Sequence, residues 1–206
     1  MSAVRVAFVL SERAEGLSPE RMAHYRDVER RLADVARADI STAHYAELGS
    51  VAADATVLSG SYDPWAAHDP EALARLHDDL RNHEGPVLGV CAGMQLLATA
   101  AGAGVGAASE PAGPVFAPVE VLDDTDLLAG LQGEVSVWHH HGDEVQSPPD
   151  GFRVLARSRS CGIEALASGT RPWWGTQFHP EAWDDTHPAG RTILENFFRL
   201  AGIPLR

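Results

Sequence analysis

The sequence predicts an α/β domain in which helices flank a largely parallel sheet, and three observations lead to that expectation. Short apolar runs alternate with longer segments of helical periodicity through the first half of the chain. This strand–helix–strand alternation is typical of parallel sheets. No repeat, low-complexity segment or shift in composition divides the 206 residues. We therefore expect one domain spanning residues 1–206.

Three strand–helix units are expected in the first half, followed by a region of short strands. The units pair strands 4–10, 55–58 and 87–91 with helices 19–36, 70–83 and 93–101. Residues 102–114 are rich in Gly, Ala and Pro and are predicted to form a surface loop. Beyond this loop, turn residues separate apolar runs that predict strands 115–122, 135–138, 152–156, 163–167 and 173–178. An amphipathic helix over residues 190–200 is expected near the end.

Composition restricts the classes of function. The formal net charge is −13 and the chain contains no lysine, so its cations are all arginines. An acidic surface repels phosphate backbones and anionic lipids, which makes nucleic acid and membrane poor partners. The absence of lysine excludes Schiff-base chemistry and a P-loop. Two cysteines are too few for a disulfide framework, and the first residues read as a strand rather than a signal peptide. We expect a cytoplasmic protein.

A nucleophile is predicted where the third strand turns into a helix. Gly89 lies two residues before Cys91, and Gly93 lies two residues after it. This is the G-x-nucleophile-x-G elbow, in which glycines make room for a strained turn at the carboxyl end of a strand. The free N–H groups of the following helix favour a thiolate there. The alternative is that Cys91 is a small buried core residue, as most free cysteines are.

A second motif favours the nucleophile over the core thiol. Pro180 biases His179 toward an extended conformation, so His179 and Glu181 are expected on one side of a strand end. A carboxylate beside an imidazole fixes its tautomer and stabilises the imidazolium. The pair is therefore suited to activating a thiol.

With both motifs in place, the chain resembles the class I, or triad, glutamine amidotransferases. The signatures of that family are G-x-C-x-G-x-Q and Q-F-H-P-E, which are present here as residues 89–95 and 177–181. The resemblance implies a flavodoxin-like three-layer α/β/α fold with a central mixed, mostly parallel sheet. It also implies an active site at the carboxyl ends of the parallel strands, as is usual for open α/β sheets.

The resemblance also assigns residues beyond the triad of Cys91, His179 and Glu181. Backbone N–H groups that bind the oxyanion are expected from Ala92 and from the loop at residues 58–64, where the family has L-S-G-G-P and this chain has Leu-Ser-Gly-Ser-Tyr-Asp-Pro. The second glycine is thus replaced by a serine. The remaining residues expected to bind the oxyanion or the substrate are Gly60, Ser61, Gln95, His140, His141 and Gly142.

Three consecutive histidines, residues 139–141, raise the question of a metal. Successive residues of a strand point to opposite faces, and no further Cys/His cluster has ligand spacing. We therefore expect no metal and no cofactor. The segment instead looks like the x-H-G-D segment of the glutaminase domain of GMP synthetase, and the likeness is strongest from Trp138 onward.

Three functions are carried forward. The resemblance implies hydrolysis of the side-chain amide of L-glutamine, through a cysteinyl thioester, with ammonia passed to a separate synthetase that binds in trans. A γ-glutamyl amide or peptide hydrolase with the same triad is the second. A non-catalytic regulatory or binding module that retains the fold is the third. The triad alone does not separate the first two, because loops select the leaving group.

Overall fold

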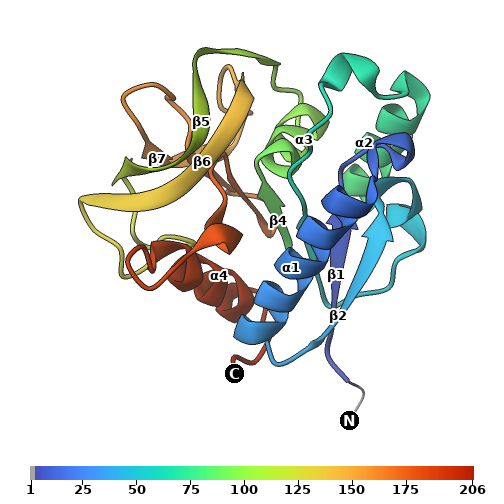
Figure 1. The fold of residues 1–206 in the computed structure, drawn as a ribbon, viewed down its shortest axis with the longest axis horizontal. Helices are drawn as coiled ribbons and strands as arrows, with labels where there is room; N and C mark the ends of the chain where they lie inside the picture. The colour runs from blue at the N-terminus through green and yellow to red at the C-terminus, as the bar shows by residue number, and fades with distance from the viewer. Residues whose placement is uncertain (1–2) are drawn as a thin grey trace.

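Five adjacent parallel strands form one half of the computed structural model, which describes residues 3–206 (Figure 1). In the sheet they follow the order β2-β1-β3-β4-β9. This order places the carboxyl ends of β3, β4 and β9 side by side, where the sequence motifs end. The strands are β1 (Arg5–Leu10), β2 (Asp39–His44), β3 (Ala55–Leu58), β4 (Val87–Val90) and β9 (Trp173–Thr176).

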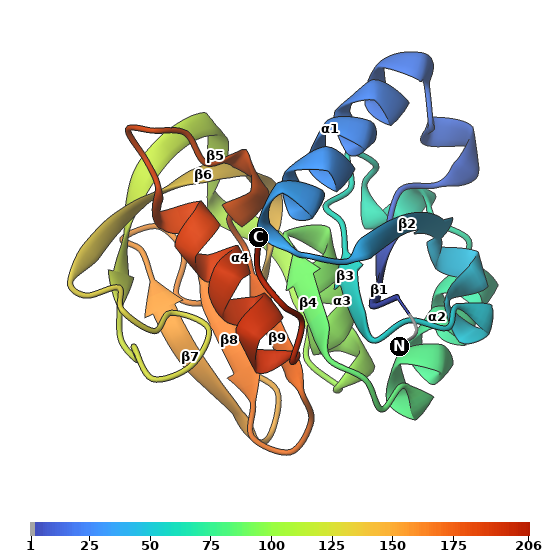
Figure 2. The ribbon, with the colours of Figure 1, turned by 90° about the horizontal axis from the view of Figure 1, so that it is seen from below.

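Helices cover both faces of this parallel half (Figure 2). On one face, α1 (Pro19–Val35) and α4 (Ala189–Leu200) pack against Phe8 of β1 and its same-face neighbours. On the other, α2 (Pro70–Asn82) and α3 (Ala92–Ala100) pack against Val9 and its neighbours. Adjacent residues of β1 thus enter opposite cores, as the two-residue period of a strand requires. The fold is the three-layer α/β/α arrangement that the resemblance implies.

The helices begin where the sequence provides caps. Ser18 and Asp69 precede α1 and α2, each followed by a proline in the first turn, and their side chains accept hydrogen bonds from Arg21 N and Glu71 N. Four short 3₁₀ helices lie in the connections: η1 (Ala14–Gly16), η2 (Tyr45–Ser50), η3 (Trp65–Ala67) and η4 (Pro180–Ala182). No helix among residues 3–206 is long and apolar enough to cross a membrane.

The other half of the sheet is antiparallel and curls away from the parallel half (Figures 1 and 2). It continues from β9 in the order β8-β7-β5-β6. The long pair β5–β6 closes over the carboxyl ends of the parallel strands, where Trp138 forms an isolated bridge with His179. Its strands are β5 (Val105–Val121), β6 (Glu134–Val145), β7 (Phe152–Arg157) and β8 (Ala165–Ser168).

The structure corrects two expectations from the sequence. The predicted surface loop at 102–114 is wrong, because β5 begins at Val105 and pairs with β6 through two register shifts, one on each side of Ala112. Gly and Pro lower the strand propensity of this segment, and the bulges accommodate them. Edge strand β2 was not expected, since most of its side chains are exposed or half-buried and give no apolar run.

Candidate active site

Cys91 occupies a strained turn between β4 and α3. Its backbone has φ 52° and ψ −108°, and it is the only non-glycine residue among residues 3–206 with a positive φ. Both flanking glycines are required by space: a Cβ on Gly89 would lie 2.4 Å from the carbonyl O of Gly93, and one on Gly93 would lie 2.4 Å from that of Leu58. Strain of this kind persists only where the surrounding structure enforces it. The local geometry is that of a nucleophile elbow.

The structure brings His179 and Glu181 to this elbow. His179 follows β9, and its backbone N–H donates to Trp138 O at 2.8 Å. Its Nδ1 lies 2.8 Å from Glu181 Oε1, while its Nε2 is buried and has no hydrogen-bond partner within the described chain. The amide of Gln177 approaches Cys91 Sγ to 3.6 Å from the same segment. The imidazole is therefore oriented by the carboxylate on one nitrogen and available for proton transfer on the other.

The electrostatics of the group favour an imidazolium. Burial lowers the pKa of His179, but the charges of Glu181 and the Cys91 thiolate outweigh burial and raise that pKa well above 6.5. Cys91 itself is only 6% exposed. A proton on His179 beside a thiolate is the arrangement from which a thiol attacks an acyl carbon and an imidazolium protonates the leaving group.

The loop after β3 presents a backbone donor to the same point. The Gly60 carbonyl accepts hydrogen bonds from Ser59 Oγ at 2.7 Å and from Tyr25 Oη at 3.2 Å. Because N–H and C=O point in opposite directions across a trans peptide, the Ser61 N–H is turned away from these hydroxyls. Gly60 itself lies against the triad: a Cβ there would be 3.0 Å from His179 Cε1. Ser61 has no positive φ, so the serine fits this backbone without strain.

A buried carboxylate that the sequence analysis missed holds this loop. Glu12 is fully buried, and its Oε2 accepts from the Tyr62 N–H at 2.8 Å and from Tyr25 Oη at 2.9 Å. Its Oε1 pairs with Arg21 at 2.9 Å, and Arg21 also pairs with Asp63 at 2.9 Å. Burial raises the pKa of Asp63, but hydrogen bonds from arginine side chains outweigh burial and lower that pKa to about 2. The one signal available was position, because Glu12 follows the carboxyl end of a predicted strand.

Helix α3 supplies the other predicted donors. Ala92 begins the helix, so its N–H has no partner in the helical ladder and lies beside Cys91. Gln95, one turn later, lines the cavity, but both protons of its amide are already donated, to Asp143 O at 2.8 Å and to Gln177 Oε1 at 3.1 Å. Its Oε1 accepts from the Trp65 indole at 2.7 Å. In this structure Gln95 ties three segments together, and its contact with substrate stays a prediction.

Strand β6 forms the opposite wall. The carbonyl O of His140 lies 3.8 Å from Cys91 Sγ, and His140, His141 and Gly142 line the cavity as predicted. His139 and His141 point to the other side of the strand, toward Glu164, which the sequence analysis also missed. Burial and the nearby His141 and His179 lower the pKa of His139 to about 4, and burial raises the pKa of Glu164 to about 7.

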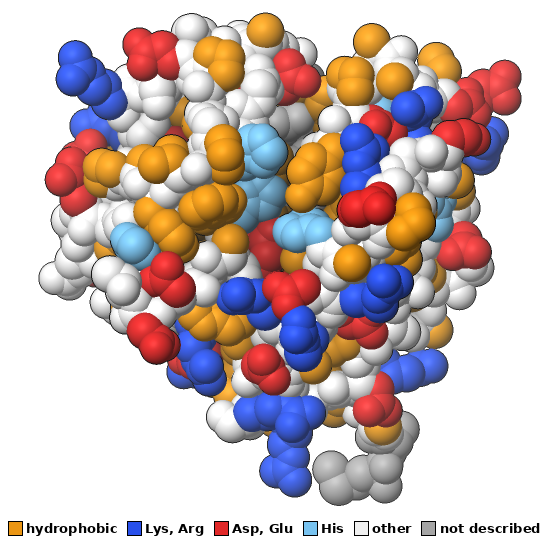
Figure 3. All heavy atoms as spheres, viewed as in Figure 1, with side chains coloured by type: hydrophobic (Ala, Val, Ile, Leu, Met, Phe, Trp, Pro, Cys, Tyr) orange, Lys and Arg blue, Asp and Glu red, His pale blue; other side chains and the backbone are white. Residues whose placement is uncertain are grey.

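A cavity of about 560 Å³ lies between the two walls. Figure 3 shows it as a hollow with histidine and hydrophobic side chains gathered around it. Its floor holds the triad, and its outer part is lined by aromatic side chains. Those side chains are Tyr62, Phe116, Trp138 and Trp183.

The described geometry agrees with the comparisons to known proteins. The pattern that defines "Glutamine amidotransferase class-I" matches residues 24–201. This chain belongs to that family. It is an amidohydrolase of the glutamine-hydrolysing type, with the flavodoxin-like fold that its sequence implies.

Among known proteins, the chain is similar to single subunits of glutamine-hydrolysing GMP synthases. It is 37% identical to that of Thermococcus kodakarensis over 71% of this chain and 74% of the relative, and 38% identical to that of Methanosarcina mazei over 73% and 75%. For Pyrococcus abyssi the identity is 42%, over 57% of this chain and 61% of the relative.

Solved structures show the same fold. A protein from Thermoplasma acidophilum, provisionally assigned as a GMP synthase subunit, superimposes with a TM-score of 0.80 at 28% identity, covering 98% of this chain and 96% of that one. A glutamine amidotransferase from Thermotoga maritima gives a TM-score of 0.67 at 21% identity, over 98% and 95%.

Proposed function

We propose that this chain is the glutamine-hydrolysing subunit of a two-subunit synthetase, with Cys91, His179 and Glu181 as its catalytic triad. The observation that carries the proposal is the elbow cysteine beside a carboxylate-bound imidazole, with His179 Nδ1 at 2.8 Å from Glu181 Oε1. The similarity to subunits of glutamine-hydrolysing GMP synthases supports a synthetase of that type as the partner.

The chemistry follows from the positions of these groups. Cys91 Sγ attacks the side-chain amide carbon of glutamine, and the oxyanion that forms is bound by the N–H groups of Ser61 and Ala92. His179 then donates its proton to the leaving nitrogen, so that the C–N bond breaks and ammonia departs. A water molecule, deprotonated by His179, attacks the resulting thioester and releases glutamate and the free thiol. Glu181 keeps His179 oriented throughout.

The ammonia requires an acceptor site that a partner supplies. The sequence contains no P-loop, and the triad lies at the bottom of an open hollow between two walls. A synthetase bound over this opening would receive ammonia directly from the site. We propose that contact with the synthetase raises the rate of glutamine hydrolysis by ordering the loop at Ser61.

A second function is favoured by the outer cavity. Its volume of about 560 Å³ lies within the roughly 300–1,000 Å³ that bound small molecules occupy, and four aromatic side chains line its outer part. Such a pocket also fits a γ-glutamyl amide with an apolar amine as the leaving group. The same triad would cleave it without a partner.

The triad is tested with the two cysteines as a matched pair. Cys91→Ala is expected to abolish release of ammonia and glutamate, whereas Cys161→Ala retains it, because Cys161 makes no contact with the triad and burial raises the pKa of its thiol. Diazo-oxo-norleucine should label wild-type protein once, at Cys91. Labelling at Cys161, or activity in Cys91→Ala, would overturn the assignment.

The partner is tested by comparing substrates. Glutamine hydrolysis is measured with the chain alone, then with the synthetase subunit of a GMP synthase and its nucleotide substrates, and then with a set of γ-glutamyl amines. Stimulation by the synthetase subunit supports ammonia donation. Efficient cleavage of one γ-glutamyl amine by the chain alone supports the hydrolase instead, and rapid unassisted turnover of glutamine contradicts the need for a partner.

A further inference from the structure

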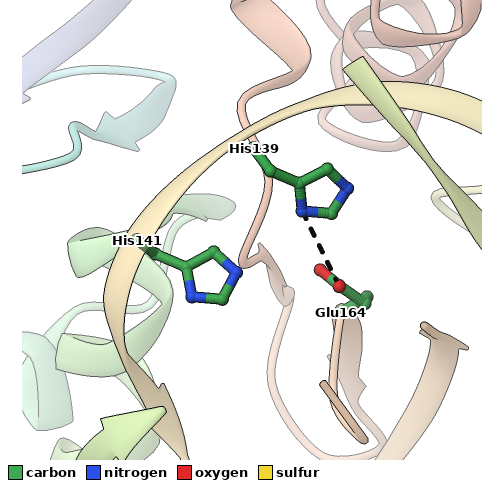
Figure 4. A group of neighbouring side chains, drawn as sticks. All are labelled: His139, His141 and Glu164. Atoms are coloured by element: carbon green, nitrogen blue, oxygen red, sulfur yellow. Dashed lines mark ion pairs between the residues drawn. The ribbon is translucent and has the colours of Figure 1, made fainter. Parts of the chain in front are cut away.

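A compact group of three metal-ligating side chains lies behind the β6 wall. His139 and His141 are two residues apart on β6, so their side chains leave the strand on the same side. Glu164 reaches them from the residue before β8, as Figure 4 shows. Nδ1 of His139 is 3.7 Å from Glu164 Oε1, and one ligand atom from each residue lies within 4.8 Å of the others.

This group is almost completely buried and lacks the hydrogen bonds that burial demands. The exposed fractions are 3% for His139, 7% for His141 and 1% for Glu164. Both carboxylate oxygens of Glu164, Nε2 of His139 and Nδ1 of His141 have no hydrogen-bond partner within residues 3–206. A buried polar atom left unpaired costs about 1–3 kcal/mol, so four of them together indicate a missing partner.

We propose that His139, His141 and Glu164 bind a zinc ion. Two imidazoles and one carboxylate are a known ligand set for Zn²⁺, with a small fourth ligand such as water. Ligand atoms at about 2.0–2.2 Å around a tetrahedral ion lie about 3.4 Å apart, close to the 3.7 Å between His139 and Glu164. The most distant pair, at no more than 4.8 Å, must approach by about 1.4 Å at most, which side-chain rotation provides.

The position of the site indicates a structural role. His140 lies between the two histidine ligands, and its carbonyl O is 3.8 Å from the nucleophile Cys91 Sγ. An ion held by His139 and His141 would fix the strand that carries this carbonyl and would join β6 to the segment before β8. The reacting groups of the triad are not ligands, so the ion stabilises the wall and takes no part in amide cleavage. The sequence analysis expected no metal because Glu164 is distant in sequence from the histidines.

The test uses the complete chain, purified without a polyhistidine tag. Metal content is measured by mass spectrometry, and zinc affinity of the EDTA-treated protein is measured by competition with a chromophoric chelator. We expect one equivalent of zinc for wild type and for Cys91→Ser, which removes the catalytic thiol as an alternative ligand. Glu164→Gln and His139→Leu should each weaken binding by at least about 100-fold, because loss of a ligand costs no less than loss of an outer partner.

A neighbouring histidine provides the matched control. His140→Gln changes the same strand on its opposite side and should bind zinc as wild type does. If Glu164→Gln does not fold, the cobalt complex of wild type decides: visible absorption without a thiolate band supports nitrogen and oxygen ligands, and a thiolate band overturns the proposal. It is also overturned by loss of binding in Cys91→Ser, by unchanged binding in Glu164→Gln, or by no binding to wild type. None of these outcomes decides the glutaminase assignment, which is measured separately.

Discussion

The two walls of the catalytic cavity satisfy their buried polar groups in opposite ways. On the wall at residues 59–63, the buried carboxylate of Glu12 has an arginine, a tyrosine hydroxyl and a backbone N–H as partners. On the β6 wall, the buried Glu164 has no hydrogen-bond partner for either oxygen within residues 3–206, and two buried imidazoles beside it are also incompletely paired. One wall is closed by protein groups alone, whereas the other has vacant ligand atoms.

This difference shows which parts of the site the chain organises by itself. The oxyanion loop departs from the family pattern at Ser61, yet the structure holds it through its backbone: the Gly60 carbonyl and the Tyr62 N–H are both fixed by side chains from other elements. Side-chain identity at Ser61 matters little under this arrangement. The β6 wall, on our proposal, depends on a bound ion. Substitutions on each wall separate the two cases, beginning with the residue pair between them.

The largest effect is expected at Glu181. Glu181→Gln removes the negative charge beside His179 and should lower turnover by about 10²- to 10⁴-fold, because the imidazole loses the partner that fixes its tautomer and stabilises its protonated form. Since Glu181 raises the pKa of His179, its removal lowers that pKa. The alkaline limb of the pH profile of kcat/KM should therefore move to lower pH.

A purely structural role for Glu181 predicts something different. Lower activity with an unchanged pH profile would mean that the charge does not act on His179. The exposed Glu195→Gln serves as the control for an added amide, because Glu195 pairs with arginines on α4 and does not line the cavity.

The loop wall is tested by Glu12→Leu. This change leaves Arg21, the Tyr25 hydroxyl and the Tyr62 N–H without their acceptor, and the free energy of unfolding should fall by about 3–5 kcal/mol. Chemical denaturation monitored by circular dichroism measures the loss. The exposed neighbour Glu15→Leu should change stability by less than about 0.5 kcal/mol. A small effect of Glu12→Leu would show that water replaces the carboxylate and that the loop does not depend on it.

The backbone donor of the same wall is tested at Ser61. Ser61→Pro deletes the N–H and should reduce turnover by about 10²- to 10³-fold, whereas Ser61→Gly keeps the N–H and should remain active. Single-turnover kinetics with glutamine measure both, and circular dichroism confirms that the proline variant is folded. Equal rates for wild type and Ser61→Pro would place the oxyanion donor elsewhere.

The contrast also explains what the sequence could and could not predict. Short motifs were sufficient for the elbow and for the His179–Glu181 pair, because each feature depends on residues within a few positions of one another. The alternation of strands and helices was sufficient for the α/β class. Segment 102–114 was misread because Gly and Pro suggested a loop, while pairing with β6 imposes a bulged strand.

Glu12 and Glu164 could not have been predicted in the same way. Each is a single carboxylate whose role is defined by partners on other elements, such as Tyr62 for Glu12 and His139 for Glu164. No local spacing links these residues. Tertiary contact alone shows that one carboxylate has its partners and the other lacks them.

The smallest effect is expected from His139→Leu in metal-free protein, and it is the sharpest comparison with Glu12→Leu. Replacing a poorly paired buried imidazole by an apolar side chain removes an unsatisfied group, so the free energy of unfolding should change by no more than about 1 kcal/mol. Zinc at about 100 times its dissociation constant should then stabilise wild type by about 2.7 kcal/mol and leave His139→Leu unchanged. Denaturation in EDTA and in zinc measures both quantities. A loss above about 2 kcal/mol in EDTA would mean that protein groups or water already satisfy His139, and the two walls would not differ as the structure indicates.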